Sequence, residues 1–270
     1  MNSKDLTGFK NWFASYAASY TTQDPVYDQP IRLKQEHTLR VCKEIVDLGI
    51  ALGRRPQDRL LAETMALFHD IGRFEQYATY GTFKDAVSEN HAALGLRVLA
   101  EQKVLEVCSE NEQFLITRAI ANHNVRTLPQ DEKGRVLFFS RLLRDADKLD
   151  VWQVFVDHYE RRNKVSNSTI TWGLPDTGIC SPKILDALRQ GKMADTADMV
   201  SLSDFKLLQM SWVFDLNFEP AFQAVRQRRY LERIAGTLPQ TPEVREVVGV
   251  LQACLEKRAH TIMEGKDDDP

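Results

Sequence analysis

The sequence predicts an all-α protein, and two observations support this fold class. Apolar residues recur at spacings of three and four along most of the chain, which is the period of an amphipathic helix. Alternation of apolar and polar residues, the pattern of a half-buried strand, is almost absent. We therefore expect a single all-α domain over residues 1–270, without an internal repeat.

The first half of the chain is expected to form helices that proline and glycine separate. The expected helices are Leu6–Tyr20, about Ile31–Leu52 after a break that contains two prolines, Pro56–His69, a helix that carries His91 and continues to about Glu101, Glu112 to about Asn124, and Lys133–Asp157. Thr7 is a candidate cap of the first helix. A loop over the candidate site is expected at Phe74–Asp85, and loops on a rigid scaffold commonly carry specificity.

The second half is expected to begin with a long loop and to continue as helices. Asn163–Pro182 is rich in Asn, Ser, Thr, Gly and Pro, which is typical of a loop. The helices expected beyond it are Pro182–Gln190, Ser203–Phe214, Glu219–Ile234 and Pro242–Met263. The tail, Gly265–Pro270, is expected to be disordered. The domain would thus contain a core at about residues 31–150 and a helical extension at about residues 182–263.

The composition excludes several classes of protein. With 43% hydrophobic and 27% charged residues, the chain is typical of a globular protein with a sizeable core. No apolar run approaches the roughly 20 residues of a membrane span, and the first residues do not resemble a signal peptide. The formal net charge of −3 does not favour a nucleic-acid polymer as partner. The 4 cysteines are far apart, as expected for core residues in a reducing compartment, and we expect a cytoplasmic protein.

The stretch Met65–Phe74, M-A-L-F-H-D-I-G-R-F, places a histidine and an aspartate side by side at the end of an apolar helical face. The apolar residues of that face recur at three- and four-residue spacing, at Leu61, Met65 and Phe68. Burying a neutral polar group without a partner costs about 2–7 kcal/mol, and burying an ion costs more. His69 and Asp70 therefore need partners, and Gly72 is expected to take a positive φ angle where the backbone turns away from them.

Further polar residues lie at positions that the helical period assigns to apolar faces. They are His37, His91, His123 and Asp147. Apolar residues lie one and two turns before Asp147, and this pattern selects Asp147 over Asp145 and Asp150 as the candidate metal ligand. Together with His69 and Asp70, these residues suit two divalent transition metal ions, for which Fe, Mn, Zn, Ni and Co are the candidates.

Three other side chains are candidates for roles beside the metals. Arg73, four residues after His69, would point into the same cleft, where it would hold a phosphoryl oxygen or pair with a nearby acid. Lys148 would lie at the rim of the cleft and bind substrate, or it would stabilise Asp145. Asp150 lies nearly one turn beyond Asp147 on the same side of the helix. It is expected to accept a hydrogen bond from a liganding imidazole.

The order of these residues resembles the binuclear branch of the HD-domain superfamily. The motifs H-D-I-G-R at residues 69–73 and D-A-D-K-L-D at residues 145–150 look like the central and closing motifs of that superfamily. The resemblance covers roughly Ile31–Asp150 and implies an HD-domain helical bundle with additional C-terminal helices. Arg73 is a departure, because many HD-domain enzymes have lysine at this place.

The resemblance and the ligand set imply a metal-dependent phosphohydrolase with Asp70 and Arg73 as catalytic residues. One metal would have the ligands His37, His69, Asp70 and Asp147, and the other would have His91, His123 and the shared Asp70. A hydroxide that bridges the metals would attack a phosphoester or phosphoanhydride. Arg73 would then hold a non-bridging oxygen in the transition state.

The expected substrate is a small phosphorylated compound, with a nucleotide as the best class by analogy. The ligand pattern is similar to bacterial HD proteins that split diadenosine tetraphosphate symmetrically. It also resembles cyclic-dinucleotide phosphodiesterases of the HD-GYP type, but no G-Y-P-type motif lies between His91 and His123, which disfavours cyclic di-GMP.

Two other functions stay open. The order of histidines and aspartates also resembles that of inositol oxygenase and a phosphonate-cleaving relative. Those enzymes activate oxygen at a mixed-valent di-iron pair. A metal-containing sensor without turnover is the other alternative. The sequence also leaves open whether the chain associates as a homo-oligomer.

Overall fold

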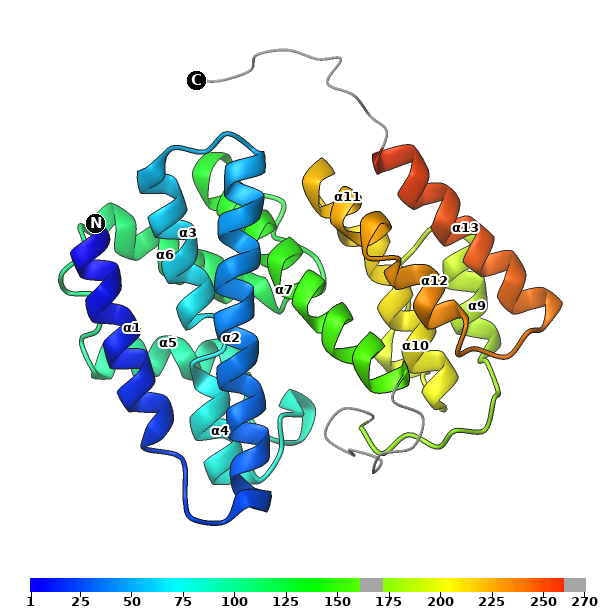
Figure 1. The fold of residues 1–270 in the computed structure, drawn as a ribbon, viewed down its shortest axis with the longest axis horizontal. Helices are drawn as coiled ribbons and strands as arrows, with labels where there is room; N and C mark the ends of the chain where they lie inside the picture. Colours follow the sequence, from blue (N-terminus) through cyan, green and yellow to red (C-terminus); the bar gives the residue numbers. More distant parts are fainter. Residues whose placement is uncertain (161–171, 260–270) are drawn as a thin grey trace. The chain divides into compact units, whose positions relative to one another are not determined.

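The computed structural model describes residues 1–160 and 172–259, and within these ranges every regular element is a helix (Figure 1). The predicted all-α class is therefore confirmed. The chain divides into two compact units, Met1–Val151 and Trp152–Pro270, and each is described by itself below. The expectation that the whole chain forms one domain stays a prediction.

Unit 1 contains six complete helices and the first part of a seventh. They are α1 (Ser3–Ala18), α2 (Pro25–Ala51), α3 (Pro56–Phe68), α4 (Gly72–Tyr80), α5 (His91–Glu101), α6 (Glu110–His123) and α7 (Gly134–Glu160), with a short 3-10 helix, η1 (Asp85–Val87), before α5. Helix α3 lies beside α2 and also packs against α1 and α6 (Figure 1). The residue that follows α3, His69, is therefore completely buried.

The first two helices begin earlier than predicted. A capping box made by Asn2 and Asp5 starts α1, so the predicted cap Thr7 lies inside the helix. The side chain of Asp24 caps α2, whose first residue is Pro25. Proline is tolerated at the first helical position because its missing N–H would have no partner there. The predicted proline-containing break is therefore wrong.

The predicted loop at Phe74–Asp85 is wrong in its first half, because α4 extends to Tyr80. Phe74 is buried, and the centroid of its ring lies 5.8 Å from that of Phe13 on α1. Such a contact joins residues far apart in the sequence, so the local pattern does not reveal it. The remaining part of the loop, which leads to α5, contains η1 as its regular element.

Gly72 does not take the predicted positive φ angle, and the structure requires glycine here for another reason. A Cβ atom at this position would lie 2.3 Å from the carbonyl oxygen of His91 and 2.5 Å from the backbone nitrogen of Gly95. Both atoms belong to the backbone of α5 and cannot move as a side chain can. Gly72 therefore allows the close approach of α4 and α5, and this approach positions His91.

Unit 2 begins within α7 and continues through the C-terminal helices. These are α9 (Pro182–Arg189), α10 (Leu202–Ser211), α11 (Glu219–Gln227), α12 (Tyr230–Ala235) and α13 (Pro242–Ala259), with the short 3-10 helices η2 (Thr196–Asp198) and η3 (Trp212–Asp215). The predicted helix Glu219–Ile234 is divided into α11 and α12, because Arg229 has a φ angle of 55°. The predicted tail and residues 163–171 of the predicted loop lie outside the described residues.

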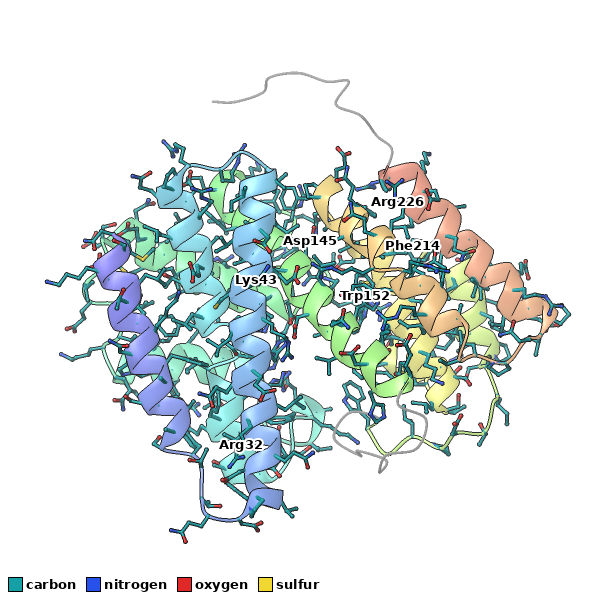
Figure 2. All side chains as sticks on the ribbon, in the orientation of Figure 1. Arg32, Lys43, Asp145, Trp152, Phe214 and Arg226 are labelled. Carbon is teal, nitrogen blue, oxygen red and sulfur yellow. The ribbon has the colours of Figure 1, made fainter. Side chains whose placement is uncertain are left out.

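The core of unit 2 is organised around Trp152, which Figure 2 labels on α7. Its indole N–H donates to the carbonyl oxygen of Gln209 at 3.0 Å. Its ring centroid lies 5.8 Å from that of Trp212 and 6.0 Å from that of Tyr230. Large aromatic side chains such as these bury much apolar surface and stabilise a core.

Candidate metal centre

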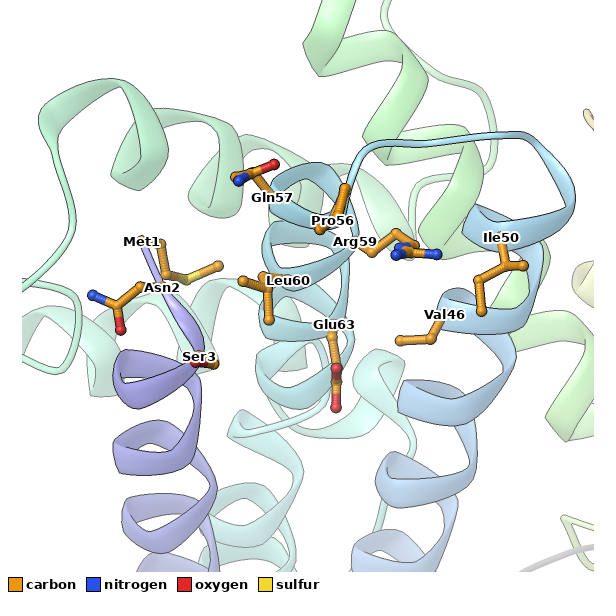
Figure 3. Close-up of a pocket in the computed structure, with 10 residues that line it drawn as sticks. All are labelled: Met1, Asn2, Ser3, Val46, Ile50, Pro56, Gln57, Arg59, Leu60 and Glu63. Atoms are coloured by element: carbon orange, nitrogen blue, oxygen red, sulfur yellow. The ribbon is translucent and has the colours of Figure 1, made fainter.

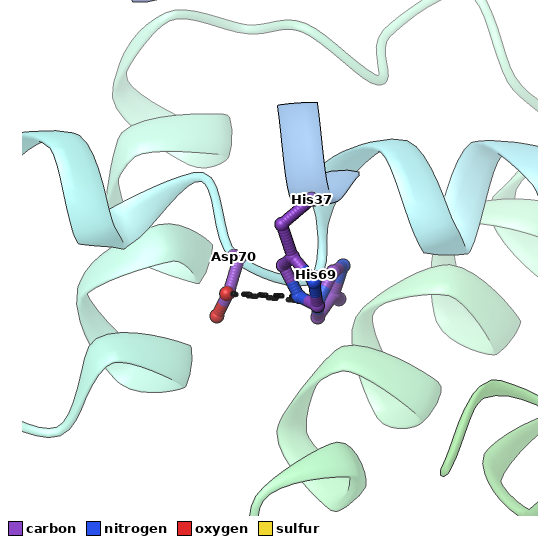
Figure 4. A group of neighbouring side chains, drawn as sticks. All are labelled: His37, His69 and Asp70. Carbon is purple, nitrogen blue, oxygen red and sulfur yellow. Dashed lines mark ion pairs between the residues drawn. The ribbon is translucent and has the colours of Figure 1, made fainter. Parts of the chain in front are cut away.

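The predicted ligand residues meet in the interior of unit 1 although they lie far apart in the sequence. His37 comes from α2, His69 and Asp70 follow α3, His91 begins α5, His123 ends α6, and Asp147 lies on α7. The four histidines and Asp70 are buried, whereas the side chain of Asp147 is 25% exposed. Figure 4 shows the rings of His37 and His69 beside the carboxylate of Asp70.

The ligand atoms form two compact triads that share Asp70. The first triad is His37, His69 and Asp70, and the second triad is Asp70, His91 and His123. In the first triad, Asp70 Oδ2 lies 3.6 Å from His37 Nε2 and 3.7 Å from His69 Nε2. In the second triad, Asp70 Oδ1 lies 3.3 Å from His91 Nε2 and 3.8 Å from His123 Nε2. Each oxygen of the carboxylate thus faces its own pair of imidazoles, as a bridging ligand requires.

Two imidazoles are oriented by the helices that carry them. His69 Nδ1 lies 2.7 Å from the carbonyl oxygen of Ala66, and His123 Nδ1 lies 2.7 Å from that of Ile120. A carbonyl oxygen can only accept a hydrogen bond, so Nδ1 carries the proton in both rings. The nitrogen left to bind a metal ion in each ring is therefore Nε2, which faces Asp70.

The other two imidazoles are oriented by carboxylates. His37 Nδ1 lies 2.6 Å from Asp150 Oδ2, which confirms the hydrogen bond predicted for Asp150. His91 Nδ1 lies 2.7 Å from Asp85 Oδ2. Hydrogen bonds of this kind fix the ring and make Nε2 a better metal ligand.

The residues present fit two transition metal ions. Nε2 of His37 and Nε2 of His69 are buried and have no hydrogen-bond partner within the described part of the chain. Leaving such an atom unsatisfied costs about 1–3 kcal/mol, and coordination of a cation would remove this cost. Imidazole nitrogens with a shared carboxylate suit Fe, Mn, Zn, Ni and Co, so the donor set does not select one of them.

Asp147 adjoins the first triad. Its Oδ1 lies 3.2 Å from His37 Nε2 and 3.7 Å from His69 Nε2. Its carboxylate therefore faces the same space as Asp70 Oδ2. That Asp147 binds the metal directly stays a prediction.

The protonation states of the cluster favour metal binding. Burial raises the pKa of Asp70, but Lys34, His69 and Arg73 outweigh it and hold this pKa well below its usual range. Burial, together with the positive charge of Arg73, lowers the pKa of His91 to about 3. The carboxylate is therefore ionised and the imidazole neutral at pH 7, which are the forms that bind metal ions.

The pKa of His37 is shifted in the opposite direction to that of His91. Burial and the charge of Lys34 lower its pKa, but the close carboxylates of Asp147 and Asp150 outweigh them, so the pKa of His37 is raised. These carboxylates favour positive charge at the first triad. A metal ion there would take the place of the proton.

Sequence reasoning missed Lys34, which lies one turn before His37 on α2. Its Nζ lies 2.6 Å from Asp70 Oδ2, and its side chain is 20% exposed. The same nitrogen lies 5.7 Å from the centroid of the Phe83 ring. The only signal in the sequence is its spacing of three residues from His37, because that spacing puts both side chains on one face of a helix.

Arg73 pairs with an acid, which is one of the two roles predicted for it. Its Nη1 donates to Asp85 Oδ1 at 2.8 Å, to the carbonyl oxygen of Phe83 at 2.6 Å and to Gln76 Oε1 at 2.9 Å. Its Nε lies 3.4 Å from Asp70 Oδ1. The guanidinium group thus lies beside the cluster, and its role in substrate binding stays a prediction.

Two residues of α7 complete the surroundings of the cluster. Arg144, which sequence reasoning missed, is buried and donates to the carbonyl oxygens of Asn122 and His123 at 3.2 and 3.1 Å. A cation at the C-terminus of a helix satisfies its last carbonyls, so Arg144 stabilises the end of α6 that carries His123. Lys148 donates to the carbonyl oxygen of Arg144 at 3.4 Å, and its substrate-binding role stays a prediction.

A separate groove lies at the end of α3 opposite His69 (Figure 3). Its volume is about 610 Å³, and apolar residues such as Val46, Ile50 and Leu60 line it together with Glu63. Its lining residues on α3 belong to the first turns of the helix, whereas His69 follows the last turn.

The fold and the site define an all-α protein with a buried centre of four histidines and a shared aspartate, suited to two metal ions. Residues 35–152 match the model of the family described as the HD domain. Residues 35–152 therefore form an HD domain, and its buried histidine and aspartate cluster is consistent with a binuclear HD site. No curated protein and no solved structure matched the chain. None of the described helices is long and apolar enough to cross a membrane, and the cytoplasmic location stays a prediction.

Proposed function

We propose that the protein hydrolyses a phosphoester or phosphoanhydride bond in a small phosphorylated compound, with a nucleotide as the substrate class. The observation that carries this proposal is the shared carboxylate of Asp70, whose two oxygens face separate pairs of buried imidazoles. Two metal ions held there would supply Lewis acidity and activate water for attack on phosphorus. The six proposed ligands are His37, His69, Asp70, His91, His123 and Asp147.

Lys34 and Arg73 are the cations that we propose for binding the phosphoryl group. Both side chains reach the carboxylate of Asp70, with Lys34 Nζ at 2.6 Å and Arg73 Nε at 3.4 Å. An anionic oxygen bound next to the metals would therefore lie close to both positive charges. Such charges stabilise the negative charge that develops during phosphoryl transfer.

The nucleotide proposal rests on the resemblance to HD-domain enzymes and on aromatic side chains beside Lys34. The rings of Phe83 and Tyr77 lie 5.0 Å apart between centroids, and both are partly exposed. Aromatic side chains provide apolar surface against which a base packs.

The proposal is tested with metal-loaded protein and a panel of phosphoesters, nucleotides and dinucleoside polyphosphates under nitrogen. We expect hydrolysis of at least one class of compound, measured by chromatography of the products. Oxygen uptake that depends on iron, without hydrolysis, would contradict the proposal and support an oxygenase. A metal-filled centre with neither activity would support a sensor.

Replacing Lys34 with glutamine is expected to raise KM for the phosphorylated substrate about 10- to 100-fold, because a charge-assisted hydrogen bond contributes roughly 1.5–3 kcal/mol. The metal content is expected to stay at the wild-type level, since Lys34 is not a proposed ligand. Steady-state kinetics and elemental analysis measure these two quantities.

The matched control is Lys43→Gln on the same helix, a residue that Figure 2 labels and whose side chain is 76% exposed. We expect wild-type kinetics for this variant. An unchanged KM in Lys34→Gln would contradict a substrate-binding role, and a loss of metal would show instead that Lys34 organises the cluster.

A further inference from the structure

The short 3-10 helix η1, which precedes α5, places a carboxylate beside the second triad. Asp85, the first residue of η1, has its Oδ2 2.7 Å from His91 Nδ1. The other nitrogen of this ring, Nε2, lies 3.3 Å from Asp70 Oδ1 and 2.9 Å from His123 Nε2. Asp85 therefore determines which nitrogen of His91 faces the shared carboxylate.

Two side chains of α4 hold Asp85 in this position. Asp85 Oδ1 accepts from Arg73 Nη1 at 2.8 Å and from Gln76 Nε2 at 2.9 Å. Gln76 is completely buried, and its Nε2 also lies 2.9 Å from Ser88 Oγ and 2.8 Å from the carbonyl oxygen of Glu89. The segment between α4 and α5 is thus tied to α4 on both sides of η1.

The four imidazoles differ in what orients them. His69 and His123 depend on carbonyl oxygens of their own helices, which are present whenever the helix forms. His37 depends on Asp150, which lies in the first triad's surroundings and is itself held by Arg40 at 2.6 Å. Each triad therefore contains one imidazole that a carboxylate from another element orients.

From these contacts we infer that Asp85 is a positioning residue for the metal ion of the second triad, and that Arg73 supports this ion through Asp85. The inference deepens the proposed function and rests on the two-metal centre. Asp85 keeps the proton of His91 on Nδ1 and increases the electron density on Nε2. A change at Asp85 should therefore weaken the second metal position and leave the first intact.

The test is a titration of chelator-treated protein with Mn²⁺. Calorimetry measures the affinity of each ion, and elemental analysis counts the bound ions. We expect two ions per wild-type chain. The Asp85→Ala variant is expected to keep one ion at wild-type affinity and to bind the second about 10–100-fold more weakly, the usual effect of losing a partner of a ligating histidine. Asp85→Asn is expected to recover part of this loss, since its amide oxygen still accepts from His91 Nδ1.

Two comparison variants make the result specific. Asp150→Ala should weaken the other ion, because it releases His37. Asp47→Ala should bind both ions as the wild type does, since Asp47 is half exposed and pairs with Lys43 on the surface of α2. The number of bound ions is measured without enzymatic turnover. The metal-binding result can therefore be interpreted even if the protein hydrolyses none of the tested substrates.

The inference is overturned by any of three results. The first is a wild-type protein that binds a single ion. The second is an Asp85→Ala variant that binds both ions with wild-type affinity. The third is a variant that loses both ions together, with the asparagine substitution giving no recovery, because Asp85 would then support the fold as a whole.

Discussion

Replacing Asp70 with alanine is expected to remove both metal ions and to reduce turnover by at least about 1,000-fold. Asp70 is the residue common to both triads, and each of its oxygens faces a different pair of imidazoles. Its removal would also leave the charges of Lys34 and Arg73 next to the cluster without their shared counter-charge, and these charges would repel metal ions. Elemental analysis of protein purified without chelator, together with hydrolysis rates, measures the effect.

Asp70→Asn separates the loss of charge from the loss of packing. The amide has nearly the same shape, but it has no negative charge and offers one oxygen, so we expect the asparagine variant to lose metal as well. Circular dichroism checks that both variants keep their helices. An Asp70 variant that retains two ions and full turnover would remove the bridging carboxylate from the proposed centre.

Replacing Gly72 with alanine is expected to destabilise the protein by about 2–3 kcal/mol, the usual cost of forcing extra atoms into a packed interior. The added Cβ would lie 2.3 Å from the carbonyl oxygen of His91, and relief of this contact requires α4 and α5 to separate. For a unit of this size, the melting temperature should fall by roughly 4–12 °C. Because His91 begins α5, binding of the second metal ion should weaken as well.

Gly8→Ala on α1 is the matched control for this prediction. A Cβ at Gly8 would have nothing within 4 Å, so it adds no contact. Alanine is favoured over glycine inside a helix by about 1 kcal/mol, so the melting temperature should stay the same or rise. Calorimetry of both variants decides the question, and a Gly72→Ala protein as stable as the wild type would contradict the role given to Gly72.

Much of the cluster could be predicted because its polar side chains interrupt apolar helical faces. His37 and His91 lie where the helical period requires apolar residues, and a polar residue in such a position needs a partner. That Asp150 accepts a hydrogen bond from one of the imidazoles was predictable from its position nearly one turn after Asp147, and the structure identifies the imidazole as that of His37. These inferences use only the spacing of residues along single helices.

The surroundings of the ligands could not be predicted in the same way. Asp85 and Lys34 are ordinary charged residues in the sequence, and neither interrupts a long apolar stripe. Asp85 reaches His91 because Arg73 and Gln76 hold the segment that contains it. A contact of this kind depends on where two helices cross, which the period of either helix does not specify.

Helix α4 was missed for a related reason. Its sequence, G-R-F-E-Q-Y-A-T-Y, is short and contains several aromatic residues with modest helix propensity. Phe74 packs against α1, and Gly72 allows contact with α5, so neighbouring helices stabilise this one. Tertiary packing commonly provides most of the stability of a short helix.

The sequence by itself determined that the protein is helical and which buried histidines gather around Asp70, because helical periodicity is a local property that composition and spacing express directly. Only the tertiary structure decided that the two oxygens of Asp70 face different imidazole pairs, and that Lys34, Asp85 and Arg144 lie around them. These arrangements depend on the distances and angles between packed helices. Those distances are set by close contacts such as that at Gly72, which join parts of the chain that no local pattern connects.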